Sequence, residues 1–143
     1  MSEPAARVLA VDLGDAHIGL ALSDPLRITA QPLETLHVAG PRQALEQVAA
    51  RARSAEAATV VVGLPLLMSG EAGERALGAR RFAEALSERL GQAVRVELWD
   101  ERLTSVQAER TMLAGNVRRK RRKLAVDAMA AVLILQSWLD AHP

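Results

Sequence analysis

The chain contains no cysteine and few aromatic residues. Its 143 residues include no Tyr, and the whole aromatic set is Phe82, Trp99 and Trp138. The absence of cysteine excludes disulfides, thiolate catalysis and cysteine-ligated zinc, and it is compatible with a reducing cytoplasm. Because aromatic side chains are scarce, the core has to be aliphatic. The same scarcity argues against a protein that stacks nucleic-acid bases on aromatic platforms.

The sequence predicts neither a signal peptide nor a membrane-spanning segment. No basic region followed by an apolar run stands at its N-terminus. The longest apolar run, AMAAVLIL at 128–135, is too short to cross a bilayer. We therefore expect a cytoplasmic protein with no membrane partner. The length and the 50% apolar content predict one domain, residues 1–143.

Positive charge is concentrated in one short segment. The formal net charge is only +1, yet six of the 18 basic residues form a single run: Arg118, Arg119, Lys120, Arg121, Arg122 and Lys123. The remainder of the chain is therefore acidic. A local basic patch indicates a polyanionic partner such as nucleic acid. A solvated loop is the alternative, and the sequence leaves both open.

Hydrophobic periodicity predicts an α/β layer fold with a mixed sheet. Two runs around Gly14 and Asp15 are typical of a hairpin, and Pro32 limits a third strand to an edge or a bulge. We expect strands over 8–14, 17–24, 27–36, 58–66 and 93–99, and helices over 40–56, within 68–91, over 104–115 and over 124–142. The basic run is expected to be a loop, and the last helix to be largely buried.

Three acidic residues stand where local propensity does not favour them. Asp12 ends the first strand, Glu101 follows Asp100 at the end of the last strand, and Asp127 interrupts an apolar helix. Each alone has a structural explanation, as a turn cap, a surface residue or a helix-dipole partner. The carboxyl ends of neighbouring parallel strands, however, meet at the edge where α/β sheets bind ligands. We therefore expect the three carboxylates to converge.

Converging carboxylates require cations. Oxygen ligands without Cys or a His cluster favour Mg²⁺ or Mn²⁺ over zinc, and the histidines, at 17, 37 and 142, are scattered. Two such ions about 3.5–4 Å apart are the arrangement used for phosphoryl displacement. The sequence thus predicts a metal-dependent nuclease whose basic run holds the nucleic-acid backbone.

Four segments resemble one family in order and spacing. VLAVDLGDAHIGLALSD, VVVGLPLLMSG, LWDERLTSVQAERTML and RKLAVDAMAAVLILQSWL are similar to motifs of the YqgF-type proteins, bacterial Holliday-junction resolvases also described as pre-16S rRNA nucleases. The resemblance covers essentially the whole chain. It implies a ribonuclease H-like fold, with a five-stranded mixed sheet flanked by helices. It also implies a divalent-metal endonuclease acting in DNA recombination and repair or in ribosome biogenesis.

The resemblance also implies residue roles. Asp12, Glu101 and Asp127 match the family's catalytic, metal-binding acids, with Asp100 a less certain neighbour. Arg102 and Thr104 match positions that contact phosphate or support Glu101, and a loop shaped by Gly63 and Pro65 lies beside the site. The family often has a Thr and a basic residue shortly after D-x-G, whereas this chain has Asp15 and Ala16. We expect this departure to affect the substrate preference more than the mechanism.

Two other functions stay open at this point. The D-x-G motif is also similar to the phosphate-binding turn of actin- and hexokinase-like ATPases, which need two large lobes. A non-catalytic nucleic-acid-binding or ribosome-assembly factor would keep the basic run without a carboxylate cluster. The sequence does not distinguish branched DNA from precursor rRNA. Symmetric junction cleavage would call for a homodimer.

Overall fold

The computed structural model describes residues 6–67, 69–104 and 119–143, and for residues 119–128 it describes the backbone. Within these ranges the strands are β1 (Arg7–Leu13), β2 (His17–Ser23), β3 (Ala30–His37), β4 (Ala57–Leu64) and β5 (Arg95–Asp100). The helices are α1 (Pro41–Ser54), α2 (Glu74–Leu90) and α4 (Arg119–Ala141), with short 3₁₀ turns η1 (Gly91–Ala93) and η2 (Glu101–Leu103). The predicted helix over 104–115 lies almost wholly outside the described residues.

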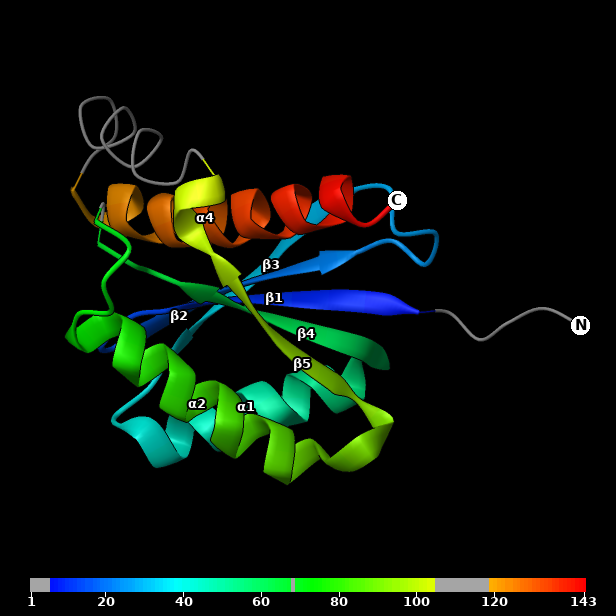
Figure 1. The fold of residues 1–143 in the computed structure, drawn as a ribbon, viewed down its shortest axis with the longest axis horizontal. Coiled ribbons are helices and arrows are strands. Elements are labelled where there is room, and N and C mark those ends of the chain that lie inside the picture. Colours follow the sequence, from blue (N-terminus) through cyan, green and yellow to red (C-terminus); the bar gives the residue numbers. More distant parts are fainter. Residues whose placement is uncertain (1–5, 68, 105–118) are drawn as a thin grey trace, which may run out of the picture.

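The strands form one mixed five-stranded sheet in the order β3-β2-β1-β4-β5. The pairs β1–β2 and β2–β3 are antiparallel, whereas β1–β4 and β4–β5 are parallel. Figure 1 shows three layers, with α4 on one face of the sheet and α1 and α2 on the other. The predicted mixed α/β sheet is confirmed.

Strand alternation divides the core into two apolar clusters. Leu9 and Val11 of β1 face α1 and α2, while Val8 and Ala10 face α4. The core is aliphatic, as the scarcity of aromatic residues requires, apart from Trp138 of α4, which is 3% exposed and belongs to the cluster between α4 and the sheet. The face on which a β1 side chain lies therefore follows from its position in the sequence.

Proline and glycine residues set several element boundaries as predicted. Pro41 opens α1, and Gly91, with φ 75°, ends α2 in the left-handed region that glycine favours. Pro32 lies in the edge strand β3, opposite a break in the register with β2. Both alternatives given for Pro32, an edge and a bulge, are therefore realised.

The prediction of a loop over the basic run is wrong for the described part of that run. The helix α4 begins at Arg119 rather than at residue 124, so residues 119–123 have helical backbone. Arg and Lys are good helix formers, and no glycine or proline separates them from the apolar helix that follows. Arg118 lies outside the described residues.

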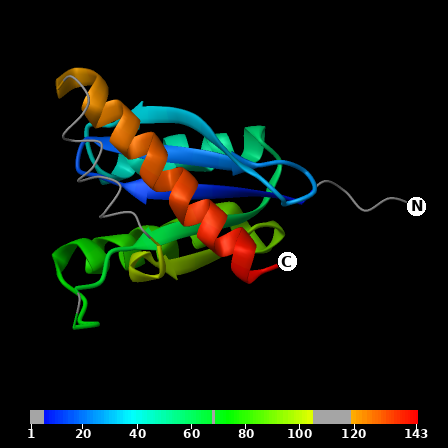
Figure 2. The ribbon, with the colours of Figure 1, turned by 90° about the horizontal axis from the view of Figure 1, so that it is seen from above.

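The helix α4 runs diagonally over the sheet. Figures 1 and 2 show that it begins at the end of the sheet where β1 finishes and runs back toward the end where β1 starts. Among its described side chains, Ala130, Ala131, Ile134, Leu135, Trp138 and Leu139 are buried. In the part of the chain that the structure describes, no helix has the length and apolarity needed to cross a membrane.

Candidate functional site

Asp12 is buried at the end of β1. It follows Val11, which pairs with Val62 of the parallel strand β4, so Asp12 lies beside Gly63. Two residues earlier, Ala10 packs on the α4 side, and strand alternation puts Asp12 on that same face. Only 3% of Asp12 is exposed. A carboxylate this deeply buried is costly unless its charge is compensated, which marks the position as a candidate site.

Gly63 provides the space for the carboxylate of Glu101. A Cβ on Gly63 would lie 2.9 Å from Oε2 of Glu101 and 2.7 Å from Cδ1 of Ile134 in α4. Both distances are shorter than carbon atoms tolerate, so a side chain here would displace the acid or the helix. The carboxylate of Glu101 therefore lies over Gly63 in β4, the strand that pairs with β1 next to Asp12.

The strand β1, which carries Asp12, and the strand β5, which ends just before Glu101, are not neighbours in the sheet, contrary to the expectation. The strand β4 lies between β1 and β5, although both run parallel to it and end at the same edge of the sheet. Gly63 of β4 lies between the two positions and has no side chain, and the carboxylate of Glu101 lies over it. The loop that Gly63 and Pro65 were expected to shape differs in the structure. Gly63 belongs to the strand β4 itself, and Pro65 follows directly after that strand.

Asp100 has a different role from that of Glu101. Its Oδ1 accepts the backbone N–H of Arg102 at 2.9 Å, which caps η2. The guanidinium donates from Nε to both oxygens at 3.1 Å and from Nη2 to Oδ2 at 2.8 Å. These hydrogen bonds hold the pKa of Asp100 below its ordinary value, so the carboxylate stays ionised. Both oxygens of Asp100 are thus occupied by Arg102.

Arg102 and Thr104 both contact the turn that contains Glu101. A Cβ on Gly70, in the loop between β4 and α2, would lie 3.4 Å from Nη1 of Arg102, so this loop borders the guanidinium. The hydroxyl of Thr104 donates to the carbonyl oxygen of Glu101 at 2.7 Å, and its backbone N–H donates to the same oxygen at 3.1 Å. Thr104 therefore supports the turn that carries Glu101.

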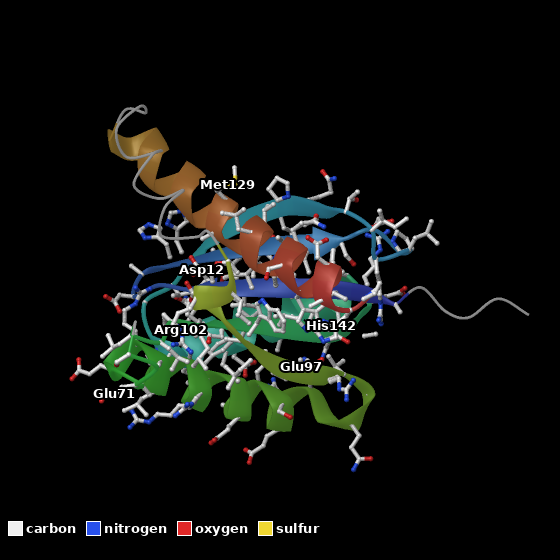
Figure 3. The ribbon with its side chains drawn as sticks, turned by 45° about the horizontal axis from the view of Figure 1, so that its top comes forward. Asp12, Glu71, Glu97, Arg102, Met129 and His142 are labelled. Carbon is white, nitrogen blue, oxygen red and sulfur yellow. The ribbon has the colours of Figure 1, made fainter. Side chains whose placement is uncertain are left out.

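Asp127 lies in α4, and its side chain is outside the described residues, as are the side chains of residues 119–123. Figure 3 shows Asp12 and Arg102 at one end of the sheet, with Glu97 and His142 toward the other. Figures 1 and 2 place the first turns of α4 at the end with Asp12. Among the described side chains, no three His, Cys, Asp or Glu residues form a metal-binding group.

Sequence reasoning missed a connection between the site and α4. The indole Nε1 of Trp99 in β5 donates to Oγ of Ser137 in α4 at 3.0 Å, and Ser137 Oγ donates to the carbonyl oxygen of Leu103 at 3.3 Å. Trp99 and Leu103 stand two residues before and after Glu101. These contacts span more than 30 residues of sequence, and no local pattern signals them.

A separate cavity of about 480 Å³ lies on the opposite face of the sheet, between α1 and α2. Its walls include Val38, Ala79 and Phe82, and its polar lining includes Asp15 and Arg75. Nη2 of Arg75 donates to the carbonyl oxygen of Leu13 at 3.4 Å. The polar lining also includes Glu74.

Comparison with known proteins places this arrangement in a family. Residues 6–141 match the family RuvX, described as Holliday junction resolvase. The chain belongs to the RuvX family. A Myxococcus xanthus protein named "Putative pre-16S rRNA nuclease" is 47% identical over 136 residues, which is 95% of this chain and 89% of that one. A Pelotomaculum thermopropionicum protein of the same name is 46% identical, covering 95% and 88% of the two chains.

Solved structures share the fold at low sequence identity. RuvC of T. thermophilus, solved in complex with a Holliday junction substrate, superposes with a TM-score of 0.56 at 18% identity, covering 96% of each chain. The Fowlpox virus resolvase, solved with junction DNA, gives 0.56 at 12% identity, covering 94% and 97%. The ribonuclease H-like fold predicted from the resemblance is confirmed. As a RuvX member the chain is an enzyme of the nuclease class, which excludes the ATPase alternative.

Proposed function

We propose that this nuclease depends on a divalent metal, Mg²⁺ or Mn²⁺, held by Asp12, Glu101 and Asp127, with a two-metal site as the expected arrangement. Its substrate would be the phosphodiester backbone of a Holliday junction or of a 16S rRNA precursor. The main supporting observation is the carboxylate of Glu101 over Gly63, beside the buried Asp12 and on the face that α4 covers.

The described residues fit a hard cation. The carboxylate of Glu101 lies over Gly63, and the buried Asp12 lies on the neighbouring strand β1 and on the same face of the sheet. Carboxylate oxygens are the ligands that Mg²⁺ and Mn²⁺ prefer. Asp127 is three residues before Ala130 and four before Ala131, both buried against the sheet. Helical periodicity therefore supports Asp127 as the third ligand.

The neighbouring residues would position the substrate and the acids. When bound, the divalent ion would polarise the scissile phosphate and activate water. Arg102, anchored by Asp100, would offer positive charge at the rim of the site, and Thr104 would hold the turn of Glu101. The basic residues 118–123 precede Asp127 and would bind the nucleic-acid backbone through its phosphates.

The name of the family and the names of its curated relatives refer to different substrates. The family description names the Holliday junction, whereas the curated relatives are named for pre-16S rRNA. The test is cleavage of a four-way DNA junction and of a precursor rRNA 5′ end side by side, with Mn²⁺, with Mg²⁺ and with EDTA. Sedimentation of the protein with the junction would show whether a dimer forms, as two symmetric cuts require.

The variants Asp12→Asn, Glu101→Gln and Asp127→Asn should each lower cleavage at least about 100-fold, as loss of a metal ligand does. Binding measured without metal should change little. Asp140→Asn, an exposed acid near the far end of α4, is the matched control and should cleave normally. If Asp12→Asn cleaves like the wild type, the proposal is wrong. A wild type that binds but never cleaves would instead indicate a non-catalytic factor.

A further inference from the structure

We propose that Ser137 is a positioning residue for Glu101, and this inference rests on the proposed function of the acids. The hydroxyl of Ser137 contacts the chain on both sides of Glu101. It accepts Nε1–H of Trp99 at 3.0 Å and donates to the carbonyl oxygen of Leu103 at 3.3 Å. Ser137 thereby joins the end of β5 and the turn η2 to the helix α4.

The chemistry of the three groups fixes the direction of this chain of hydrogen bonds. An indole N–H can only donate and a carbonyl oxygen can only accept, so a group between them must do both. A serine hydroxyl has one proton and two lone pairs, which meets both requirements. Alanine, cysteine or an aliphatic residue at position 137 would not join Trp99 to Leu103 in the same way.

This connection restrains Glu101 where strand hydrogen bonds cease. Pairing between β4 and β5 ends at Leu64 and Asp100, so the backbone of Glu101 has already left the sheet. Asp100 caps the turn from within, and Thr104 closes it on the carbonyl oxygen of Glu101. Both of these contacts are internal to the turn. Ser137 joins the backbone of the turn to another element, the helix α4.

The same contact relates two of the proposed metal ligands. Asp127 is ten residues before Ser137 on α4, about 15 Å along the helix axis at 1.5 Å per residue. A shift of α4 along the sheet would therefore move Asp127 relative to Glu101. By joining α4 to both flanks of Glu101, Ser137 fixes the register in which the two acids meet. Its role is to orient the ligands without touching the metal or the substrate.

The test compares Ser137→Ala, Ser137→Thr and Trp99→Phe in the full chain, with Ser87→Ala on the exposed face of α2 as the matched control. Mn²⁺ binding is measured by calorimetric titration, and cleavage is measured against Mn²⁺ and substrate concentration. Ser137→Ala should weaken Mn²⁺ binding and lower kcat by about 10-fold each, as loss of a residue supporting metal ligands does. The KM for nucleic acid should stay within about two-fold, because phosphate contacts remain.

Rescue separates a positioning role from a merely structural one. Ser137→Thr keeps the hydroxyl and should restore Mn²⁺ affinity to within about two-fold of the wild type. Trp99→Phe removes the indole donor and should lower Mn²⁺ affinity and kcat, as Ser137→Ala does. The double variant Ser137→Ala/Trp99→Phe should lose no more of either than Ser137→Ala alone. If Ser137→Ala does not fold at the assay temperature, Trp99→Phe carries the test.

The outcomes distinguish the two proposals. A wild type without Mn²⁺ binding or metal-dependent cleavage would overturn the proposed function. A wild type that binds and cleaves, with Ser137→Ala matching it in both, would overturn the role of Ser137 alone. Equal losses in the alanine and threonine variants would also overturn it, because the hydroxyl would then not be responsible.

Discussion

Replacing Gly63 with alanine should damage the site more than it damages the fold. The φ angle of Gly63 lies outside the left-handed region, so the backbone accepts alanine without strain. The added Cβ meets two groups instead: Oε2 of Glu101 at 2.9 Å and Cδ1 of Ile134 at 2.7 Å. To reach ordinary contact near 3.4 Å, the carboxylate must retreat by about half an ångström.

The two contacts have separate consequences. Overpacking against Ile134 should cost about 1–3 kcal/mol, which lowers Tm by about 3–10 °C in a chain of this length. Displacing a reacting group by a fraction of an ångström should lower kcat about 10- to 100-fold. Thermal unfolding followed by circular dichroism measures the first effect. Metal-dependent cleavage of a fluorescent substrate, well below Tm, measures the second.

A second substitution separates stability from activity. Ile134→Val deletes the Cδ1 atom, so the double variant Gly63→Ala/Ile134→Val relieves the contact with α4 and keeps the contact with Glu101. We expect Tm to recover in part and kcat to stay low. Gly78→Ala in α2, where an added Cβ meets nothing within 4 Å, is the control and should leave cleavage unchanged. Normal cleavage by Gly63→Ala would refute the placement of Glu101 at this position.

Three further predictions follow from the site. Asp100→Asn should lower metal-dependent cleavage by about 10-fold, because Asp100 holds Arg102 and supports the turn of Glu101, whereas Glu101→Gln should lower it at least about 100-fold. The reverse order would exchange their roles. Because Arg102 lowers the pKa of Asp100, the pair stabilises the fold above about pH 4, and this benefit disappears as the pH falls through the lowered pKa. Urea unfolding of wild type and Asp100→Asn from pH 2 to 7 should therefore converge at the acidic end. Neutralising residues 118–123 should weaken binding about equally for all sequences and flatten its salt dependence, which a fluorescence titration in KCl measures.

Much of the fold followed from local sequence patterns. The apolar alternation of β1 and β2 and the turn at Gly14 are readable within a few residues. The N-terminal Pro41 and the C-terminal Gly91 of two helices are equally local signals. Asp12 was identified because an acid at the end of a buried strand contradicts that pattern. Local chemistry of this kind determines where elements begin, end and face.

The rest depended on contacts between distant segments. Sequence alone did not show that β4 separates β1 from β5, so the importance of Gly63 as the space between two acids could not be derived. The occupation of Asp100 by Arg102 depends on a turn whose geometry the sequence leaves open. The hydrogen bonds of Ser137 join residues that no periodicity relates. The start of α4 differs from the prediction because a basic run is compatible with both a loop and a helix.

Pro32 has a consequence for how two copies of this protein can meet. It lies in β3, which forms one border of the sheet, at the point where its register with β2 is interrupted. Proline has no N–H to offer an incoming strand, and an irregular border resists the addition of another strand. Extension of the sheet by a second molecule through β3 is therefore disfavoured. We expect any symmetric pair that cuts both arms of a junction to associate through helices, loops or the opposite border instead.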